Sequence, residues 1–119
     1  MKKKILVIED DQEVLTMLLD YLKLLGYEAK GAEDGLTGLK ALRSNTFDAV
    51  ITDITIPYVS GIGIISIIKR DNPDLPVIAI TGFGEEVEAL AQEKHADAVL
   101  SKPFEMKELK ELLERSLGD

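Results

Sequence analysis

Residues 50–57 read VITDITIP, and this stretch decides the fold. It is a run of β-branched apolar residues that contains a single acidic residue, Asp53. Such a short apolar run predicts a strand covered on both faces, as in a parallel sheet. An ionised carboxylate at the edge of a buried strand is costly unless it is paired or bound to a cation. The rest of the chain therefore has to supply a partner for Asp53.

Apolar runs and helical patterns alternate along the whole chain. We predict strands at 5–8, 27–32, 47–52, 76–81 and 96–101. We predict helices through Val14 to Leu25, through Leu36 to Leu42 with Asp34 as cap, through Ile64 to Ile68 with Ser60 as cap, at 85–94, and at 104–117. Strands that alternate with helices imply right-handed βαβ units. The predicted class is α/β, with one doubly wound, five-stranded parallel sheet.

Length and composition exclude several kinds of protein. The 119 residues suit one compact domain spanning 1–119, and the net charge of -8 disfavours direct binding to nucleic acid or anionic membranes. The chain has no cysteine, which excludes disulfides and thiolate chemistry. Its apolar runs are much shorter than the ~18 residues of a membrane span. We expect a cytoplasmic domain without direct nucleic-acid or membrane contacts.

Polar residues follow four of the predicted strands. In an open parallel α/β sheet, ligands bind outside the carboxyl ends of the strands. We therefore expect the polar residues that follow the strands to share one rim of the sheet. These residues are Glu9, Asp10 and Asp11 after the first strand, Asp53 after the third, Thr81 and Gly82 at the end of the fourth, and Ser101 and Lys102 at the end of the fifth.

This set of side chains suits phosphoryl chemistry. Glu9, Asp10 and Asp53 would repel one another if crowded together, and a hard cation such as Mg²⁺ would relieve that repulsion. A carboxylate such as Asp53 can act as a nucleophile toward a phosphoryl group. Lys102 can neutralise charge on the phosphoryl oxygens, and the hydroxyl of Thr81 can bind one of them.

Simpler structural roles are open for the same residues. Asp10 can be the N-cap of the first helix, with Glu13 completing a capping box. Asp53 can start a turn before Pro57. Lys102 can be a solvated surface lysine, as most lysines are.

Two enzyme or cofactor classes fit the residues less well. A Mg²⁺-dependent hydrolase of the haloacid-dehalogenase type needs a second aspartate two residues after Asp53, where this chain has Thr55. A flavin or dinucleotide module needs phosphate-binding glycines after the first strand, where the acids at 9–11 would repel phosphate.

Four segments resemble the receiver domains of two-component response regulators, and they occur in the order and at the spacing of that family. The segments are KILVIEDDQEVLTMLLDYL (4–22), FDAVITDITIPYVSGIGII (47–65), LPVIAITGFGEE (75–86) and ADAVLSKPF (96–104). The resemblance covers essentially the whole chain. It implies a chemotaxis-regulator-like, flavodoxin-like (βα)5 fold with strand order 2-1-3-4-5.

The resemblance also implies a role for individual residues. It places the phosphorylation site on Asp53, the Mg²⁺ ligands on Glu9, Asp10, Asp53 and the backbone carbonyl of Thr55, the switch hydroxyl on Thr81 and the phosphate-binding lysine on Lys102, with a cis Lys102–Pro103 bond. A histidine kinase or phosphotransfer protein would supply the phosphoryl group. Output would go through the face formed by the fourth helix, fifth strand and fifth helix of a monomer or weak dimer. The implied protein is not an enzyme beyond autocatalytic phosphoacceptance and autodephosphorylation.

The chain departs from the family pattern at Val99. The family usually has Tyr or Phe three residues before the lysine, and that ring turns inward when the threonine hydroxyl shifts. Valine is too short for this movement. We therefore expect output to depend more on the loops after the third and fourth strands. The alternative function is an interaction module that keeps the receiver fold without signalling by phosphorylation.

Overall fold

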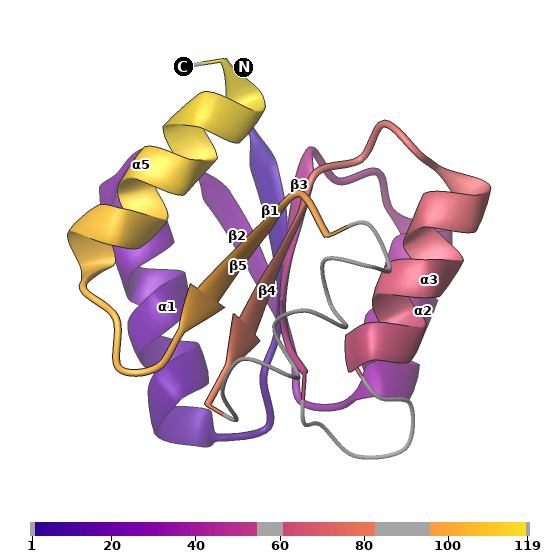
Figure 1. The fold of residues 1–119 in the computed structure, drawn as a ribbon, viewed down its shortest axis with the longest axis horizontal. Helices are drawn as coiled ribbons and strands as arrows, with labels where there is room; N and C mark the ends of the chain where they lie inside the picture. The colour runs from indigo at the N-terminus through magenta and orange to yellow at the C-terminus, as the bar shows by residue number, and fades with distance from the viewer. Residues whose placement is uncertain (1, 55–60, 83–95, 119) are drawn as a thin grey trace.

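The computed structural model describes residues 2–54, 61–82 and 96–118, which form five strands and four helices within these ranges (Figure 1). The elements are β1 (Lys4–Ile8), α1 (Gln12–Leu24), β2 (Glu28–Ala32), α2 (Gly35–Ser44), β3 (Ala49–Asp53), α3 (Gly61–Asp71), β4 (Val77–Thr81), β5 (Ala98–Ser101) and α5 (Met106–Leu117). All five predicted strands are present, with ends within two residues of the prediction. The predicted helix at 85–94 and the predicted cap Ser60 lie outside the described residues.

The five strands form one parallel sheet in the order β2-β1-β3-β4-β5. Helices α1 and α5 cover one face of this sheet, and α2 and α3 cover the other (Figure 1). The arrangement confirms the predicted α/β class and the strand order implied by the resemblance. It also places the carboxyl ends of all five strands along one edge of the sheet.

The core has two layers because side chains alternate between the faces of a strand. In β1, Ile5 and Val7 pack in the layer beneath α1 and α5, whereas Leu6 and Ile8 pack in the layer beneath α2 and α3. All four side chains are fully buried. The nearly continuous apolar strands in the sequence are thus explained by cover on both faces. Within the described ranges, no helix is long and apolar enough to cross a membrane.

Helix α2 does not bury Leu36, the first of the apolar residues from which the helix was predicted. Asp34 caps the helix as expected, since its Oδ1 accepts a hydrogen bond of 2.7 Å from the N–H of Thr37. Leu36, however, is 49% exposed, and the buried residues of the helix include Gly38 and Ala41. A Cβ atom at Gly38 would clash with the side chain of Ile8. Small residues therefore bring α2 close to the sheet and turn Leu36 toward solvent.

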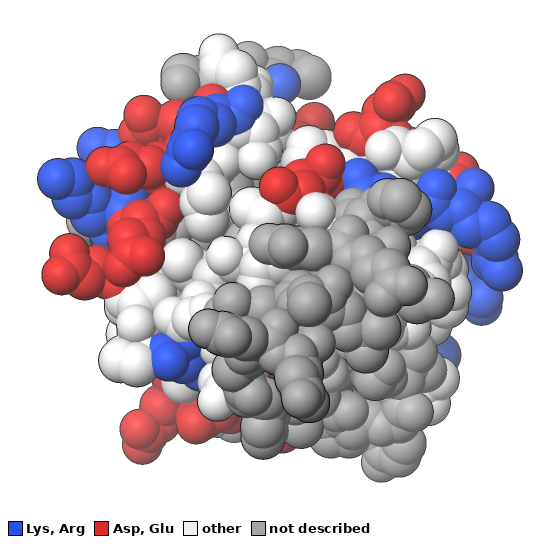
Figure 2. Space-filling model, viewed as in Figure 1, with Lys and Arg blue, Asp and Glu red and all other residues white. Residues whose placement is uncertain are grey.

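Both signs of charge occur on the face shown in Figure 2. Acidic and basic side chains are interspersed over α5, and basic side chains gather at the side formed by α2 and α3. In the described part of this face, charge is therefore mixed in sign. A concentration of one sign occurs instead at the carboxyl ends of β1 and β3.

Candidate functional site

The sheet brings the predicted polar residues to one edge. Glu9 directly follows β1, Asp53 is the last residue of β3, Thr81 is the last residue of β4, and Lys102 directly follows β5. Because neighbouring strands are parallel and in register, these positions lie side by side at the carboxyl edge of the sheet. Asp53 belongs to the strand itself, which ends one residue later than predicted.

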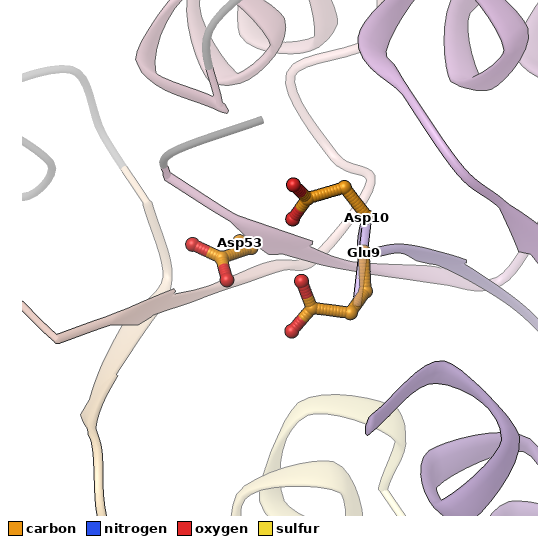
Figure 3. A group of neighbouring side chains, drawn as sticks. All are labelled: Glu9, Asp10 and Asp53. Atoms are coloured by element: carbon orange, nitrogen blue, oxygen red, sulfur yellow. The ribbon is translucent and has the colours of Figure 1, made fainter. Parts of the chain in front are cut away.

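Three of these residues form an acidic cluster, which we define as Glu9, Asp10 and Asp53. Each offers a carboxylate oxygen, and these oxygens all lie within 4.8 Å of one another. Figure 3 shows Glu9 and Asp10 extending from the end of β1 toward the same space as Asp53 on β3. Glu9 and Asp53 are only 2% and 6% exposed, whereas Asp10 is exposed to solvent. Two nearly buried carboxylates thus share a site that solvent can reach from one side.

Lys102 is the cationic partner of this cluster. Its Nζ donates hydrogen bonds of 2.8 Å to Oδ2 of Asp53 and 3.3 Å to Oε1 of Glu9. Its backbone N–H donates to the carbonyl oxygen of Thr81 at 2.7 Å, which continues the pairing of β5 with β4. The Lys102–Pro103 bond is cis, as predicted. Lys102 therefore bridges two acids, while its side chain stays 35% exposed to solvent.

The electrostatics of the cluster follow from burial and crowding. Burial, together with the negative charge of Asp53, raises the pKa of Glu9 from 4.5 to about 7. Burial alone would lower the pKa of Lys102, but the hydrogen bond and charge of Asp53 and the charge of Glu9 outweigh it and raise that pKa. Lys102 is thus held in its charged form, while the cluster resists carrying all of its negative charges at once.

The N-cap of α1 is Asp11, not Asp10. Oδ1 of Asp11 accepts hydrogen bonds from the N–H groups of Glu13 at 3.0 Å and Val14 at 3.3 Å. The interpretation of Asp10 as the cap is therefore wrong by one residue. With the cap supplied by its neighbour, Asp10 extends its carboxylate toward Asp53 instead (Figure 3).

The structure describes two of the remaining predicted residues, Thr81 and Val99, but not Thr55. Thr81 is fully buried at the end of β4, one strand away from Asp53. Val99 lies opposite Ala79 in β5 and is partly buried against the core layer beneath α2 and α3. Thr55, whose backbone carbonyl was assigned to the metal, lies outside the described residues.

Gly61 is a positioning residue, whereas the sequence indicated it only as a turn glycine that follows Asp53 and Pro57. Its N–H donates to the carbonyl oxygen of Ile54 at 3.0 Å, so α3 begins directly beside the end of β3. A Cβ atom here would overlap the backbone of Asp53 and Ile54. Only glycine permits this approach. The available signal was a glycine that opens a helix soon after the proposed nucleophile.

The donor set of the acidic cluster fits a hard divalent cation. Carboxylate oxygens are the ligands that Mg²⁺ prefers, and it commonly keeps several waters and phosphate oxygens as further ligands. Burial and the charge of Asp53 raise the pKa of Glu9 in spite of Lys102, and a bound cation would favour the ionised form of Glu9. The arrangement can hold Mg²⁺ and a phosphoryl group beside a buried carboxylate.

Comparisons with known proteins agree on one protein family. The model of the response regulator receiver domain matches residues 5–114. The response regulator receiver protein CpdR of Brucella abortus is 32% identical over 97% of this chain and 97% of its own length. The transcriptional regulatory protein PrrA of Mycobacterium tuberculosis is 33% identical over 89% of this chain and 46% of its own length. This chain thus spans half or less of the length of several transcriptional regulators that it matches.

A solved structure that contains Mg²⁺ is similar over almost the whole chain. The response regulator protein TrrA of Thermotoga maritima, determined in complex with Mg²⁺ and beryllium fluoride, has a TM-score of 0.89 and 33% identity, covering 97% of this chain and 99% of TrrA. An acidic cluster of this kind is typical of the Mg²⁺ site of receiver domains. Receiver domains interact with histidine kinases and are typically not classed as enzymes. The chain belongs to the response regulator receiver domain family of two-component signalling.

Proposed function

We propose that residues 1–119 act as one phosphoacceptor receiver domain, in which Asp53 takes a phosphoryl group from a histidine kinase, a phosphotransfer protein or a small phosphodonor. One observation carries the proposal. Asp53 is a nearly buried carboxylate that is paired with Lys102 at 2.8 Å and crowded by Glu9 and Asp10. A side chain with only a structural role gains nothing from this crowding, whereas a nucleophile that must face a phosphoryl group and a cation requires it.

The reaction moves a phosphoryl group between two nucleophiles. A carboxylate oxygen of Asp53 forms a bond to phosphorus while the bond from phosphorus to the histidine nitrogen of the donor breaks. The electron pair of the broken bond stays on the imidazole, and Asp53 becomes an acyl phosphate. The chain contributes mainly orientation and compensation of charge, which dominate catalysis of phosphoryl transfer.

The metal would be held by Glu9, Asp10, Asp53 and the backbone carbonyl of Thr55. When bound, Mg²⁺ neutralises charge on the transferring phosphoryl oxygens. A cation held there would also offset the burial and the charge of Asp53 that raise the pKa of Glu9, and so favour ionised Glu9.

Lys102 and Thr81 would respond to the new group. In the unphosphorylated chain, Nζ of Lys102 bonds to Oδ2 of Asp53. After transfer, Lys102 can bind a phosphoryl oxygen in place of the carboxylate, and the hydroxyl of Thr81 can donate to another. These exchanges at the ends of β4 and β5 would alter the surface near α5 and switch the binding of a partner protein. Since Val99 replaces the usual aromatic residue, the loops that follow β3 and β4 would carry much of this change.

Intact-mass analysis with acetyl phosphate and Mg²⁺ tests the proposal directly. The wild-type chain should gain about 80 Da, the mass of one phosphoryl group, as an adduct that alkali or hydroxylamine removes. Asp53→Asn should gain nothing. Asp48→Asn is the matched control, because Asp48 lies just before the other end of β3 and hydrogen-bonds to the N–H of Lys4. It should be modified like the wild type.

Each result of this experiment has a clear meaning. Adduct formation that requires both Mg²⁺ and Asp53 supports the phosphoacceptor function. A folded wild-type chain that binds Mg²⁺ but takes no phosphoryl group from acetyl phosphate or from a panel of histidine kinases would overturn the proposal. The alternative of a non-signalling interaction module would then hold.

A further inference from the structure

Strand β5 is a short edge strand that ion pairs hold at both ends. Its four residues, Ala98–Ser101, pair only with β4, because β5 is the last strand of the sheet. At its carboxyl end, Lys102 binds Asp53 and Glu9. At its amino end, Oδ2 of Asp97 lies 2.7 Å from Nζ of Lys69 on α3. The second ion pair is remote from the acidic cluster and has no place in the chemistry proposed above.

Asp97 fixes the register of β5 against β4. Its N–H donates to the carbonyl oxygen of Val77 at 2.9 Å, and its Oδ2 accepts from the N–H of Val77 at 2.7 Å. Both bonds go to one residue, so they set Asp97 beside Val77 and Ala98 beside Ile78. Register is weakly specified in a short strand that has a neighbour on one side only, and this pair of bonds specifies it.

Lys69, on helix α3, binds the side chain of Asp97 and so connects the start of β5 to α3. Its side chain is 12% exposed, and Nζ lies 2.9 Å from the carbonyl oxygen of Leu75 and 3.3 Å from that of Pro73, besides its contact with Asp97. An ammonium group has three hydrogen-bond donors, and these three acceptors match them. The partly buried ammonium group of Lys69 thus joins the end of α3, the connection to β4 and the start of β5.

We propose that Lys69 and Asp97 are positioning residues for Lys102, and this inference rests on the proposed function of the site. A slip of β5 by one residue would move its carboxyl end by about 3.3 Å and turn each side chain to the opposite face. Lys102 would then no longer reach Asp53. In the register that Asp97 sets, Nζ of Lys102 lies 2.8 Å from Oδ2 of Asp53. The bonds of Asp97 to Val77 and Lys69 hold β5 in place while Nζ of Lys102 changes its hydrogen-bond partner from Asp53 to a phosphoryl oxygen.

The first test observes Lys102 without any phosphoryl donor. Nitrogen-15 NMR of lysine ammonium groups in the metal-free chain reports the hydrogen bonds of Nζ, with Lys102→Met assigning the signal. Asp97→Ala and Lys69→Met should shift or broaden the Lys102 signal. Asp71→Ala is the matched control, because it removes an exposed ion pair with Arg70 at the same end of α3 that does not involve β5. It should leave the signal unchanged.

The second test measures the rate of phosphorylation by acetyl phosphate. Displacement of a charged group by about 1 Å can cost on the order of a hundredfold in rate, so Asp97→Ala should slow the reaction between tenfold and about a hundredfold. The Mg²⁺ affinity should not fall, because the acidic cluster lies at the ends of β1 and β3 and would lose only the competing ammonium group of Lys102. Asp97→Asn keeps an acceptor for the N–H of Val77 and should recover part of the rate, which a general loss of stability would not explain.

The outcomes separate this inference from the proposed function. If Asp97→Ala and Lys69→Met are folded by circular dichroism and the Lys102 signal matches that of the wild type, the positioning role is wrong. If Asp97→Ala does not fold, Asp97→Asn and Lys69→Met decide in the same way. If the wild type takes no phosphoryl group, the proposed function fails, but the NMR comparison still decides whether Asp97 and Lys69 position Lys102.

Discussion

Carboxylates at the two ends of the parallel sheet differ in how fully donors and positive charge pair with them. At the amino end, Asp48 accepts a hydrogen bond of 2.7 Å from the N–H of Lys4, and Asp97 accepts bonds from Lys69 and Val77. At the carboxyl end, Glu9 and Asp53 share the ammonium group of Lys102, and the carboxylate of Asp10 lies beside them. Carboxylates at the amino end are matched by donors, whereas those at the carboxyl end exceed the positive charge available from that lysine.

The difference separates side chains that stabilise the fold from those that form the site. Asp48 is half-buried and Asp97 is exposed, and matched donors let such carboxylates stabilise the folded state through charge-assisted hydrogen bonds. Burial and the nearby charge of Asp53 both disfavour ionised Glu9, and the raised pKa of Glu9 reflects this cost. The carboxyl end therefore lowers the stability of the metal-free chain, and a bound cation would recover it. Substitutions at the two ends should consequently have opposite effects.

The largest effect should come from Gly61→Ala, which disturbs the backbone that carries Asp53. The added methyl group would overlap the backbone of Asp53 and Ile54, which cannot move as a flexible side chain can. We expect a loss of about 3 kcal/mol in the free energy of unfolding, the upper range for overpacking, and a weaker Mg²⁺ affinity. Urea unfolding and calorimetric titration with Mg²⁺ measure the two.

Gly82→Ala is the control for this substitution. A Cβ atom at Gly82 would meet the side chain of Lys102 no closer than 3.9 Å, and the residue is exposed. Its stability should change by less than about 0.5 kcal/mol, as for most surface substitutions. Equal effects of the two substitutions would show that the close approach of α3 to β3 does not hold Asp53 in place.

The next effect is a pH dependence that arises from Glu9. Its pKa is about 7 in the folded chain against an ordinary 4.5, so the folded state binds the proton more tightly. The resulting stabilisation is complete below pH 4.5 and is lost as the pH rises through 7. In the absence of Mg²⁺, this group should make the chain on the order of 2 kcal/mol less stable at pH 8 than at pH 5.

Comparison with Glu9→Gln isolates this contribution from other titrating groups. The variant should lose most of the decline in stability between pH 5 and pH 8, measured by urea unfolding in the presence of EDTA. Saturating Mg²⁺ should reduce the decline in the wild type, because the ion favours ionised Glu9. An identical decline in the wild type and the variant would mean that Glu9 is ionised throughout this range.

A third prediction compares the two aspartates near the ends of β3. Asp48→Ala leaves the N–H of Lys4 without its side-chain acceptor and should cost about 1.5 kcal/mol of stability. Asp53→Ala removes one of three crowded charges and should raise the stability of the metal-free chain by about 1 kcal/mol, the scale of one pKa unit. Mg²⁺ should stabilise Asp48→Ala but not Asp53→Ala. Thermal unfolding with and without Mg²⁺ gives both results, and a loss of stability in Asp53→Ala would contradict the proposed contrast.

The fold was predictable because its main signals are local. The residues ILVI at 5–8 and VIAI at 77–80 are nearly continuous apolar runs, which is the pattern of a strand with helices on both faces. The location of the site followed from the same strands, since their carboxyl ends lie at one edge. The convergence of Glu9, Asp53 and Lys102 therefore needed no knowledge of side-chain packing.

The features that escaped prediction depend on contacts between distant parts of the chain. Leu36 has the helical spacing of an inward residue, but the close fit of Gly38 against Ile8 decides which face of α2 is buried. The interaction of Lys69 with Asp97 joins α3 to the start of β5, and no local pattern marks it. The sequence shows that residue 61 is a glycine, but not why a glycine is needed there. The need arises because the backbone of Asp53 lies too close for a Cβ atom.

The smallest expected effect distinguishes Asp10 from Asp11, two neighbours that the sequence alone could not assign. Asp11→Ala removes the side-chain cap of α1 and should cost about 0.5 kcal/mol, the lower range for an exposed cap, with Mg²⁺ affinity retained. Asp10→Ala should leave stability nearly unchanged and lower the Mg²⁺ affinity, because its carboxylate belongs to the acidic cluster. Urea unfolding and Mg²⁺ titration of both variants measure this. If Asp11→Ala weakened Mg²⁺ binding more than Asp10→Ala did, the cap and the ligand would have to be exchanged. Asp11 would then be the metal ligand and Asp10 the cap of α1.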